Sequence, residues 1–330
     1  MTRLLAVTVA LLLTVGSSSS LAYLKLGAMV NGHVVDATWQ QQPIGYFITN
    51  RDSNSVTAAD LRGAVERAAN TWASVGFASV RFSYQGMTTA PPEGTDGRNT
   101  IGFLDRPDLD RVLGATSFMI DATTGAIYEA DVFFNTRFAF SVAPGGQAER
   151  VDLESVALHE LGHLLGLGHS AIGETEGNAG TGRRVLGSGS IMFPLALSAG
   201  ATADRVLQAD DIAGISDLYP GAGSLMDTGG IVGRVTKNGQ GVNGAHVVAF
   251  NPETGVLIGN FTLTSAGEFV IARLPPGPYL LRVEPVDDIS PDSFFPTPVD
   301  VDFRVTYAPR MVVAPRGGSS NSIEIQVLPK

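Results

Sequence analysis

The sequence predicts an α+β domain followed by an all-β sandwich domain, and three observations support this order. Up to about residue 220, strand-like runs alternate with stretches of helical spacing. The segment GAGSLMDTGG at 221–230 has the composition of a linker. Beyond it, short alternating runs are separated by turn residues every eight to twelve positions, which is typical of a β-sandwich. We therefore place the first domain at 36–220, the linker at 221–228, and the second domain with a C-terminal extension at 229–330.

The composition limits the classes of function. The chain has 330 residues, enough for two domains of ordinary size. Its formal net charge is −10, which argues against a nucleic acid partner because phosphate backbones are bound by clustered Lys and Arg. It contains no cysteine, so no disulfide can form, and stability must come from core packing or a bound metal.

The N-terminus has the order of a secretory signal peptide. MTR supplies positive charge, LLAVTVALLLTVG is an apolar run of 13 residues, and SSSSLA offers small residues before a cut near Ala22. The run is too short to span a bilayer, and no other stretch approaches the roughly 20 apolar residues needed. We expect a signal peptide at 1–22, a short segment at 23–35, no transmembrane anchor, and a secreted or periplasmic monomer.

The first domain is expected to open with a strand and an amphipathic helix. ATWQQQPIGYFITN at 37–50 has the apolar and aromatic texture of a strand. The segment 55–75 has helical spacing. Its apolar stripe consists of Leu61, Val65, Ala68, Ala69 and Trp72.

The rest of this domain divides into further strands, two helices and a loop. Apolar runs bounded by Gly, Pro and Asp predict four strands, at 79–86, 99–105, 113–120 and 126–136. Asp152 is a favourable N-cap for the next helix. The Gly-, Ser- and Thr-rich stretch 171–190 is expected to be a loop. LQADDIAGISDLYP at 207–220 predicts a closing helix, with acids in its first turn and Pro220 just past its end.

Three of the five histidines of the chain lie in VALHELGHLLGLGHS at 156–170. Residues four apart share one face of a helix, so His159 and His163 present two imidazoles to one point. Gly166 can end the helix with a positive φ and turn the chain so that His169 approaches the same point. Histidines packed on an ordinary helix would not require this spacing. Three neutral imidazoles with one open position describe a catalytic zinc site.

The chemistry follows from the open position. Zinc lowers the pKa of a bound water and polarises a carbonyl group. Glu160 lies beside the two helical histidines, rotated about 100° by the helical pitch, so its carboxylate can serve as general base without being a ligand. These parts suit the hydrolysis of peptide bonds.

With these residues, the sequence resembles the metzincin clan of zinc endopeptidases. The clan motif is matched at His159, Glu160, His163, Gly166 and His169. The resemblance implies a metzincin-type catalytic domain, with a twisted mixed sheet and about three helices. It also implies that Met192, in SIMFP at 190–194, forms the methionine-containing turn beneath the zinc. Ser170, directly after the third histidine, and the closing helix resemble the matrixin family within this clan.

The matrixin resemblance carries further expectations for the substrate cleft. The edge strand that pairs with the substrate backbone would contain Gly114, Ala115 and Thr116. The pocket for the residue after the scissile bond would be walled by Phe193, Pro194 and Leu195, and Ser155 would partly set its depth.

Departures from the family pattern are equally informative. Without cysteine, the latency by a propeptide cysteine that is usual in animal matrixins is impossible here. Only His33 and His246 remain outside the motif, so a second, structural zinc site is not expected. Calcium is an open alternative for the acidic loops, against the simpler reading that their carboxylates are only solvated. The residues concerned are Asp105, Asp108, Asp121 and Asp131.

The segment 229–285 resembles the carboxypeptidase regulatory-like domain, a transthyretin-like β-sandwich. The pieces that match are GGIVGRVTKNGQGVNGAHVVAFNPETG and SAGEFVIARLPPGPYLLRVEP, with glycines where tight turns are expected. We expect His246 to be a strand residue. The resemblance is informative about fold, and it suggests a structural or adhesive role.

Together these features predict a secreted zinc-dependent metalloendopeptidase that acts on protein or peptide substrates. The alternative is a non-catalytic secreted protein that binds a matrix or another surface and retains the zinc fold. Glu160 argues against this alternative, because proton transfer is the one role that a non-catalytic protein does not need.

Overall fold

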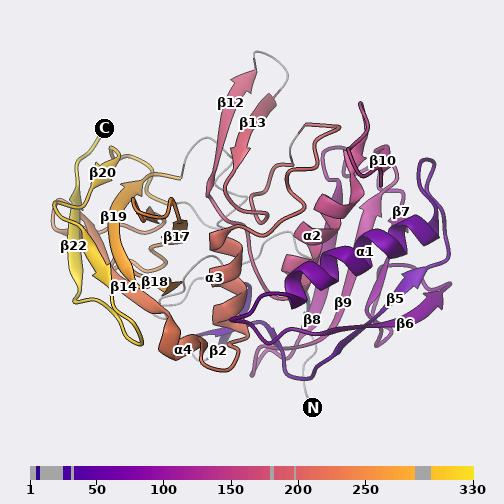
Figure 1. The fold of residues 1–330 in the computed structure, drawn as a ribbon, viewed down its shortest axis with the longest axis horizontal. Coiled ribbons are helices and arrows are strands. Elements are labelled where there is room, and N and C mark those ends of the chain that lie inside the picture. Colours follow the sequence, from indigo (N-terminus) through magenta and orange to yellow (C-terminus); the bar gives the residue numbers. More distant parts are fainter. Residues whose placement is uncertain (1–4, 8–24, 31–32, 179–181, 197, 287–298) are drawn as a thin grey trace.

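The computed structural model describes residues 5–7, 25–30, 33–178, 182–196, 198–286 and 299–330 (Figure 1). Over these ranges the chain forms an α+β domain with a mixed sheet, followed by a domain of two β-sheets, which confirms the predicted fold class. The predicted signal peptide, 1–22, lies outside the described residues except for 5–7. Within the described part of the chain, no helix combines the length and apolar character that crossing a membrane requires.

A seven-stranded mixed sheet forms the backbone of the first domain. Its strands follow the order β1-β8-β9-β7-β5-β6, and β4 also pairs with β9. The pairs that join β4, β5, β6, β7 and β9 are parallel, whereas β8 runs antiparallel to β9. The bounds are β1 (Leu5–Val7), β4 (Thr38–Trp39), β5 (Ile44–Thr49), β6 (Phe82–Thr88), β7 (Thr100–Leu104), β8 (Gly114–Ile120) and β9 (Ala126–Asn135).

One end of strand β8 has an unpaired outer edge. β1 pairs with β8 only at Phe118–Ile120. Among the described residues, therefore, no strand covers the outer edge of Gly114–Ser117. Such an edge can accept an extended peptide through main-chain hydrogen bonds.

Helices α1 (Ala58–Ala73) and α2 (Leu153–Leu164) pack together against the mixed sheet (Figure 1). α1 begins with a capping box, in which Thr57 Oγ1 accepts a hydrogen bond from Asp60 N and the Asp60 carboxylate accepts one from Thr57 N. Its predicted apolar stripe is buried. Trp72 Nε1 donates to the Leu158 carbonyl at 2.8 Å, which fixes the two helices against each other.

The N-cap of α2 is Asp152, as predicted, and its carboxylate accepts a hydrogen bond from Ser155 N at 2.9 Å. The closing helix α3 (Ala209–Leu218) is also present, and the short α4 (Ser224–Asp227) lies in the predicted linker. Three described helices thus lie within 36–220, as the sequence predicts for the first domain. Smaller elements complete the domain: β2 (Gly27–Val30), β3 (His33–Asp36), β10 (Phe140–Ser141) and β11 (Val151–Asp152).

The prediction of a loop at 171–190 was wrong. Most of this segment forms a hairpin of β12 (Gly173–Asn178) and β13 (Gly182–Ser188), which projects from the body of the molecule (Figure 1). The segment is rich in Gly and has little apolar alternation, so the strand signal is weak. The pairing of its two arms, rather than its local composition, makes it a hairpin.

The second domain consists of two sheets that enclose one core. The first contains β14 (Gly229–Lys237), β15 (Gln240–Gly241), β18 (Glu268–Leu274) and β22 (Ile323–Val327), and β22 runs parallel to β14. The second contains β16 (His246–Phe250), β17 (Leu257–Phe261), β19 (Gly277–Glu284), β20 (Thr306–Tyr307) and β21 (Val312–Ala314), with β17 at its edge. Alternate side chains of both sheets are buried between them, among them Ile231, Val235, Val247, Phe269 and Leu281.

Candidate metal centre and cleft

Helix α2 positions the first two histidines of the motif. The Nδ1 atom of His159 lies 2.7 Å from the Ile191 carbonyl, and the Nδ1 atom of His163 lies 2.8 Å from the Leu167 carbonyl. A carbonyl oxygen only accepts hydrogen bonds, so both Nδ1 atoms carry the ring proton. The two Nε2 atoms then present bare lone pairs to each other, 3.0 Å apart.

Gly166 brings the third histidine to the same point. Its φ of +97° ends the helix, and a Cβ atom there would overlap the carbonyl oxygen of Ala37, so only glycine fits. The chain then turns back, and His169 Nε2 lies 3.2 Å from His163 Nε2. In the described part of the chain, these three histidines are the only group of three or more His, Cys, Asp or Glu residues whose ligand atoms all lie within 4.8 Å of one another.

The three rings fit a zinc-type cation. Ligand atoms about 2.0–2.1 Å from a tetrahedral zinc ion lie roughly 3.3 Å apart, close to the two Nε2 separations observed. Loss of solvation lowers the pKa of His159 to about 3 and that of His163 well below its ordinary value, so both rings are neutral, as ligation requires. Facing lone pairs repel each other unless a cation lies between them. The donor set therefore favours a bound divalent metal.

Glu160 lies next to the histidines and is buried, with 4% of its surface exposed. Burial raises the pKa of its carboxyl to about 7, and a hydrogen bond from the Thr116 hydroxyl partly opposes this shift. Thr116 Oγ1 lies 2.8 Å from Glu160 Oε2 and 3.0 Å from the Glu160 carbonyl oxygen. Gly114, Ala115 and Thr116 all lie in strand β8, as predicted. The side chain of Thr116 also contacts Glu160, which the sequence did not predict.

The segment of the predicted methionine turn packs against the helix that carries His159 and His163. Met192 is buried, and its sulfur packs so closely on Gly162 of α2 that a Cβ atom at Gly162 would overlap it. The backbone of this turn is held by Asp211 of α3, whose carboxylate accepts hydrogen bonds from Ser190 Oγ and Ile191 N. The Ile191 carbonyl accepts a hydrogen bond from His159 Nδ1. Ile191 therefore joins Asp211 to the first histidine through two hydrogen bonds, one at its N–H group and one at its carbonyl group.

Sequence reasoning missed two of these residues. The acids of the ADDI segment were interpreted only as favourable charges at a helix N-terminus, whereas Asp211 is buried and holds the turn. Gly162 is a small residue inside a helix, where glycine is unfavourable by about 1 kcal/mol relative to alanine. A glycine at such an unfavourable position suggests that another group packs closely against the helix there, as Met192 does.

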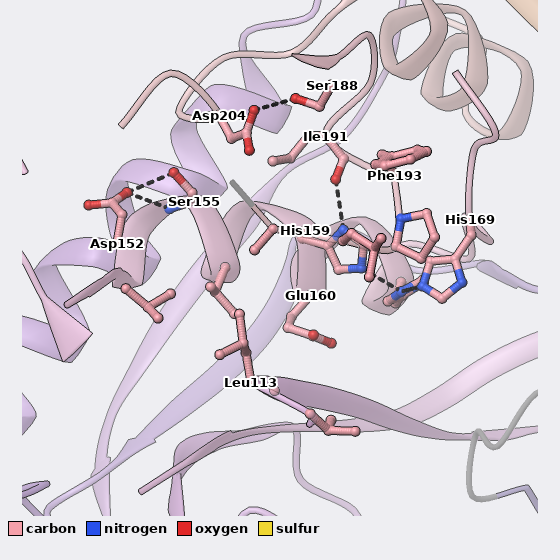
Figure 2. Close-up of a pocket in the computed structure, with 18 of the residues that line it drawn as sticks. Leu113, Asp152, Ser155, His159, Glu160, His169, Ser188, Ile191, Phe193 and Asp204 are labelled. Carbon is pink, nitrogen blue, oxygen red and sulfur yellow. Dashed lines mark hydrogen bonds between the residues drawn. The ribbon is translucent and has the colours of Figure 1, made fainter. Parts of the chain in front are cut away.

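A cavity of about 390 Å³ opens beside the histidines (Figure 2). Figure 2 shows His159, Glu160 and His169 on one side of it, and Asp152, Ser155, Ser188 and Asp204 further along. All of the predicted metal, catalytic and substrate-binding residues line this cavity, whereas Met192 does not. They are Gly114, Ala115, Thr116, Ser155, His159, Glu160, His163, His169, Phe193, Pro194 and Leu195.

The remaining candidate residues lie elsewhere. The acids considered for calcium do not form a group of three or more within coordination reach among the described residues, so calcium stays a prediction. Asp108 instead pairs with Arg106, and Asp121 binds the Thr123 hydroxyl. His33 lies in β3, and His246 lies in β16, where its Nδ1 atom is 3.0 Å from Glu284 Oε1.

Comparison with known proteins agrees with this geometry. Over 187 residues, 55% of this chain and 44% of the relative, the chain is 28% identical to Metalloendoproteinase 1-MMP of Arabidopsis thaliana. It is 30% identical to Metalloendoproteinase 2-MMP of the same plant over 173 residues, 51% of this chain and 39% of the relative. A 73-residue segment, 22% of this chain and 15% of the relative, is 48% identical to Metalloendoproteinase 5-MMP, also of Arabidopsis thaliana.

The chain spans less than half the length of each of these curated relatives. Two family matches cover separate parts of it: residues 38–176 match Matrixin, and residues 230–287 match the Carboxypeptidase regulatory-like domain. Both resemblances expected from the sequence are therefore confirmed. The chain contains a matrixin domain, which carries the three histidines, and after it a carboxypeptidase regulatory-like domain.

Proposed function

We propose that this chain is an exported zinc-dependent metalloendopeptidase, with His159, His163 and His169 as zinc ligands and Glu160 as general base. The observation that carries the proposal is the convergence of three Nε2 atoms beside a buried carboxylate, at the wall of a cavity. The match to Matrixin and the names of the plant relatives support the same class of enzyme. The apolar N-terminal run supports export.

The cleft suits an extended peptide. The outer edge of β8 at Gly114–Thr116 offers main-chain groups to a substrate backbone. The cavity beside the histidines would receive the side chain that follows the scissile bond, against Phe193, Leu195 and Ser155. We expect cleavage within an extended segment, rather than at a chain end, because the outer edge of β8 is open over Gly114–Ser117.

Glu160 carries the proton transfers. When bound, zinc supplies Lewis acidity that polarises the scissile carbonyl and acidifies water. The Glu160 carboxylate accepts the proton of the attacking water and then delivers it to the leaving amine. The Thr116 hydroxyl holds one carboxylate oxygen, which leaves the other directed to the cleft.

The test is cleavage of a proteome-derived peptide library by the purified protein, with Glu160→Gln as the inactive variant. We expect internal cleavage that phenanthroline abolishes and added zinc restores, and a fall of about 10²- to 10⁴-fold in kcat/KM for Glu160→Gln. Glu154→Gln is the matched control, because Glu154 lies on the same helix but pairs with Arg67 instead of lining the cavity. Its activity should stay close to that of the parent protein. A zinc-loaded protein that cleaves no peptide in the library would instead support a non-catalytic binding role.

A further inference from the structure

The carboxypeptidase regulatory-like domain contacts the segment that follows the third histidine. Strand β17 lies at the edge of its sheet and packs against α3 of the matrixin domain (Figure 1). From this edge, Gly259 N donates a hydrogen bond to Asp210 Oδ1 at 2.9 Å. The other oxygen of the same carboxylate accepts a hydrogen bond from Ser170 Oγ at 2.6 Å. Asp210 and Ser170 are both buried, with 3% and 4% of their surfaces exposed.

Two further contacts join the same segment to the second domain. Ala171 packs against a small apolar cluster that contains Phe261 and Val286. The Ile172 side chain lies over Gly259: a Cβ atom at Gly259 would come within 3.2 Å of it and within 2.5 Å of His246 Nε2. All three residues directly after His169 are thus held, directly or through Asp210, by the second domain.

His169 is positioned by a different part of the chain from the other two histidines. His159 and His163 are fixed by the backbone hydrogen bonds of α2. His169 follows the turn at Gly166 and lies outside any helix or strand. Within the matrixin domain, the segment after it is also held by hydrogen bonds from Ser170 N to the Met192 carbonyl, from Gly189 N to the Ile172 carbonyl and from Ile172 N to Ser170 Oγ.

We propose that the carboxypeptidase regulatory-like domain is a positioning element of the metal centre, which places His169 through the hydrogen-bonded series Gly259–Asp210–Ser170. The proposal depends on the zinc assignment of the proposed function. In this arrangement the second domain is required for full zinc affinity, in addition to any contact that it makes with a substrate. Partners that orient a ligand typically change metal affinity by about 10- to 100-fold when they are lost.

The test measures the zinc dissociation constant of the full-length protein by competition with a fluorescent chelator. Ser170→Ala and Asp210→Ala should each weaken zinc binding by about 10- to 100-fold. The Ser170→Ala/Asp210→Ala double variant should bind zinc about as tightly as the more affected of the two single variants, because both residues act through one series of hydrogen bonds. Ser170→Thr keeps a hydroxyl and should retain the parent affinity. The absorption spectrum of the cobalt-substituted protein should change in the two alanine variants only, since it reports the coordination geometry.

Two controls separate this effect from general destabilisation. Arg273→Ala removes another contact of the second domain with the same helix, the hydrogen bond to Asp217, while keeping the Lys25–Asp217 ion pair, and should leave the zinc affinity unchanged. Gly259→Ala disturbs the contact with Ile172, whereas Gly255→Ala strains a turn of the same domain (φ +76°) that has open space around it. Gly259→Ala should weaken zinc binding and Gly255→Ala should not.

The positioning role would be overturned if Gly259→Ala and Gly255→Ala lost the same amount of zinc affinity. It would also be overturned if Ser170→Ala and Asp210→Ala bound zinc as tightly as the parent protein. If the parent protein itself binds no zinc, the proposed function fails as well. If the parent protein binds zinc tightly and the Ser170→Ala and Asp210→Ala variants bind it equally tightly, the positioning role is wrong but the proposed function stands.

Discussion

Thr116 Oγ1 and Glu160 Oε2 lie 2.8 Å apart, joining the edge strand β8 to the helix that carries the histidines. A hydroxyl can donate to a carboxylate, so this contact fixes one oxygen of Glu160 on strand β8. The same strand that would bind the substrate backbone therefore also orients the proposed general base.

Thr116→Val should lower kcat without loss of zinc. Valine has the same shape as threonine but lacks the hydroxyl, and a hydrogen bond to a charged group contributes about 1.5–3 kcal/mol. We expect kcat/KM to fall by about 10- to 100-fold in steady-state assays. Thr116→Ser, which retains the hydroxyl, is the matched control. Equal activity of the valine and serine variants would show that the contact has no part in catalysis.

Zinc should stabilise the folded protein through the three histidines. A ligand that binds only the folded state raises its stability according to its concentration and dissociation constant. In differential scanning fluorimetry of the metal-free protein, added zinc should raise Tm, and His163→Asn should remove most of this response. His246→Asn, in the second domain, should keep it. A zinc response that survives in His163→Asn would locate the ion elsewhere.

Gly162→Ala should destabilise the protein, although alanine is the better helix former. The new Cβ atom would overlap the Met192 sulfur and lie 3.0 Å from the Trp72 ring. Overpacking of this kind costs about 1–3 kcal/mol, measured by chemical denaturation.

Gly63→Ala provides the opposite case within α1. Its Cβ atom would meet only the end of the Arg67 side chain, at 3.3 Å, which can move. This substitution should stabilise the protein by roughly 0.5–1 kcal/mol. A stabilising effect at both glycines would contradict the close contact beneath the histidines.

The pH dependence of stability should report Asp131. Burial raises the pKa of this carboxyl to about 7, above its ordinary value of 3.8. Between these two pH values the folded state binds more protons than the unfolded state, so the contribution of Asp131 to stability falls as pH rises from about 4 to about 7. Asp131→Asn removes the cost of the buried charge and keeps an acceptor for Thr100 N.

In calcium-free buffer, the gain in unfolding free energy of Asp131→Asn over the parent should therefore grow from pH 4 to pH 7 and then level off. Asp108→Asn is the control, since Asp108 is exposed and its pKa is lowered by Arg106. A gain for Asp131→Asn that is the same at pH 4 and pH 8 would refute the raised pKa.

The local features of this protein were predictable because they depend on short-range geometry. The spacing of four residues puts His159 and His163 on one helical face whatever surrounds them. Gly166 ends that helix because it can adopt a positive φ, and the observed value is +97°. The apolar period of α1 and the alternating runs after the linker likewise reflect nearest neighbours along the chain.

Only the tertiary structure decided which distant residues meet. No local signal pairs Asp210 with Gly259 and Ser170, or turns Thr116 toward Glu160, because these contacts join segments between 40 and 49 residues apart. The hairpin at 173–188 arises in the same way, from pairing rather than from propensity. The sequence by itself determined the three-histidine motif and the two domains. The packing of α3 against β17 decided that these domains meet next to the segment that follows His169, because burial and hydrogen bonding across an interface depend on the whole chain.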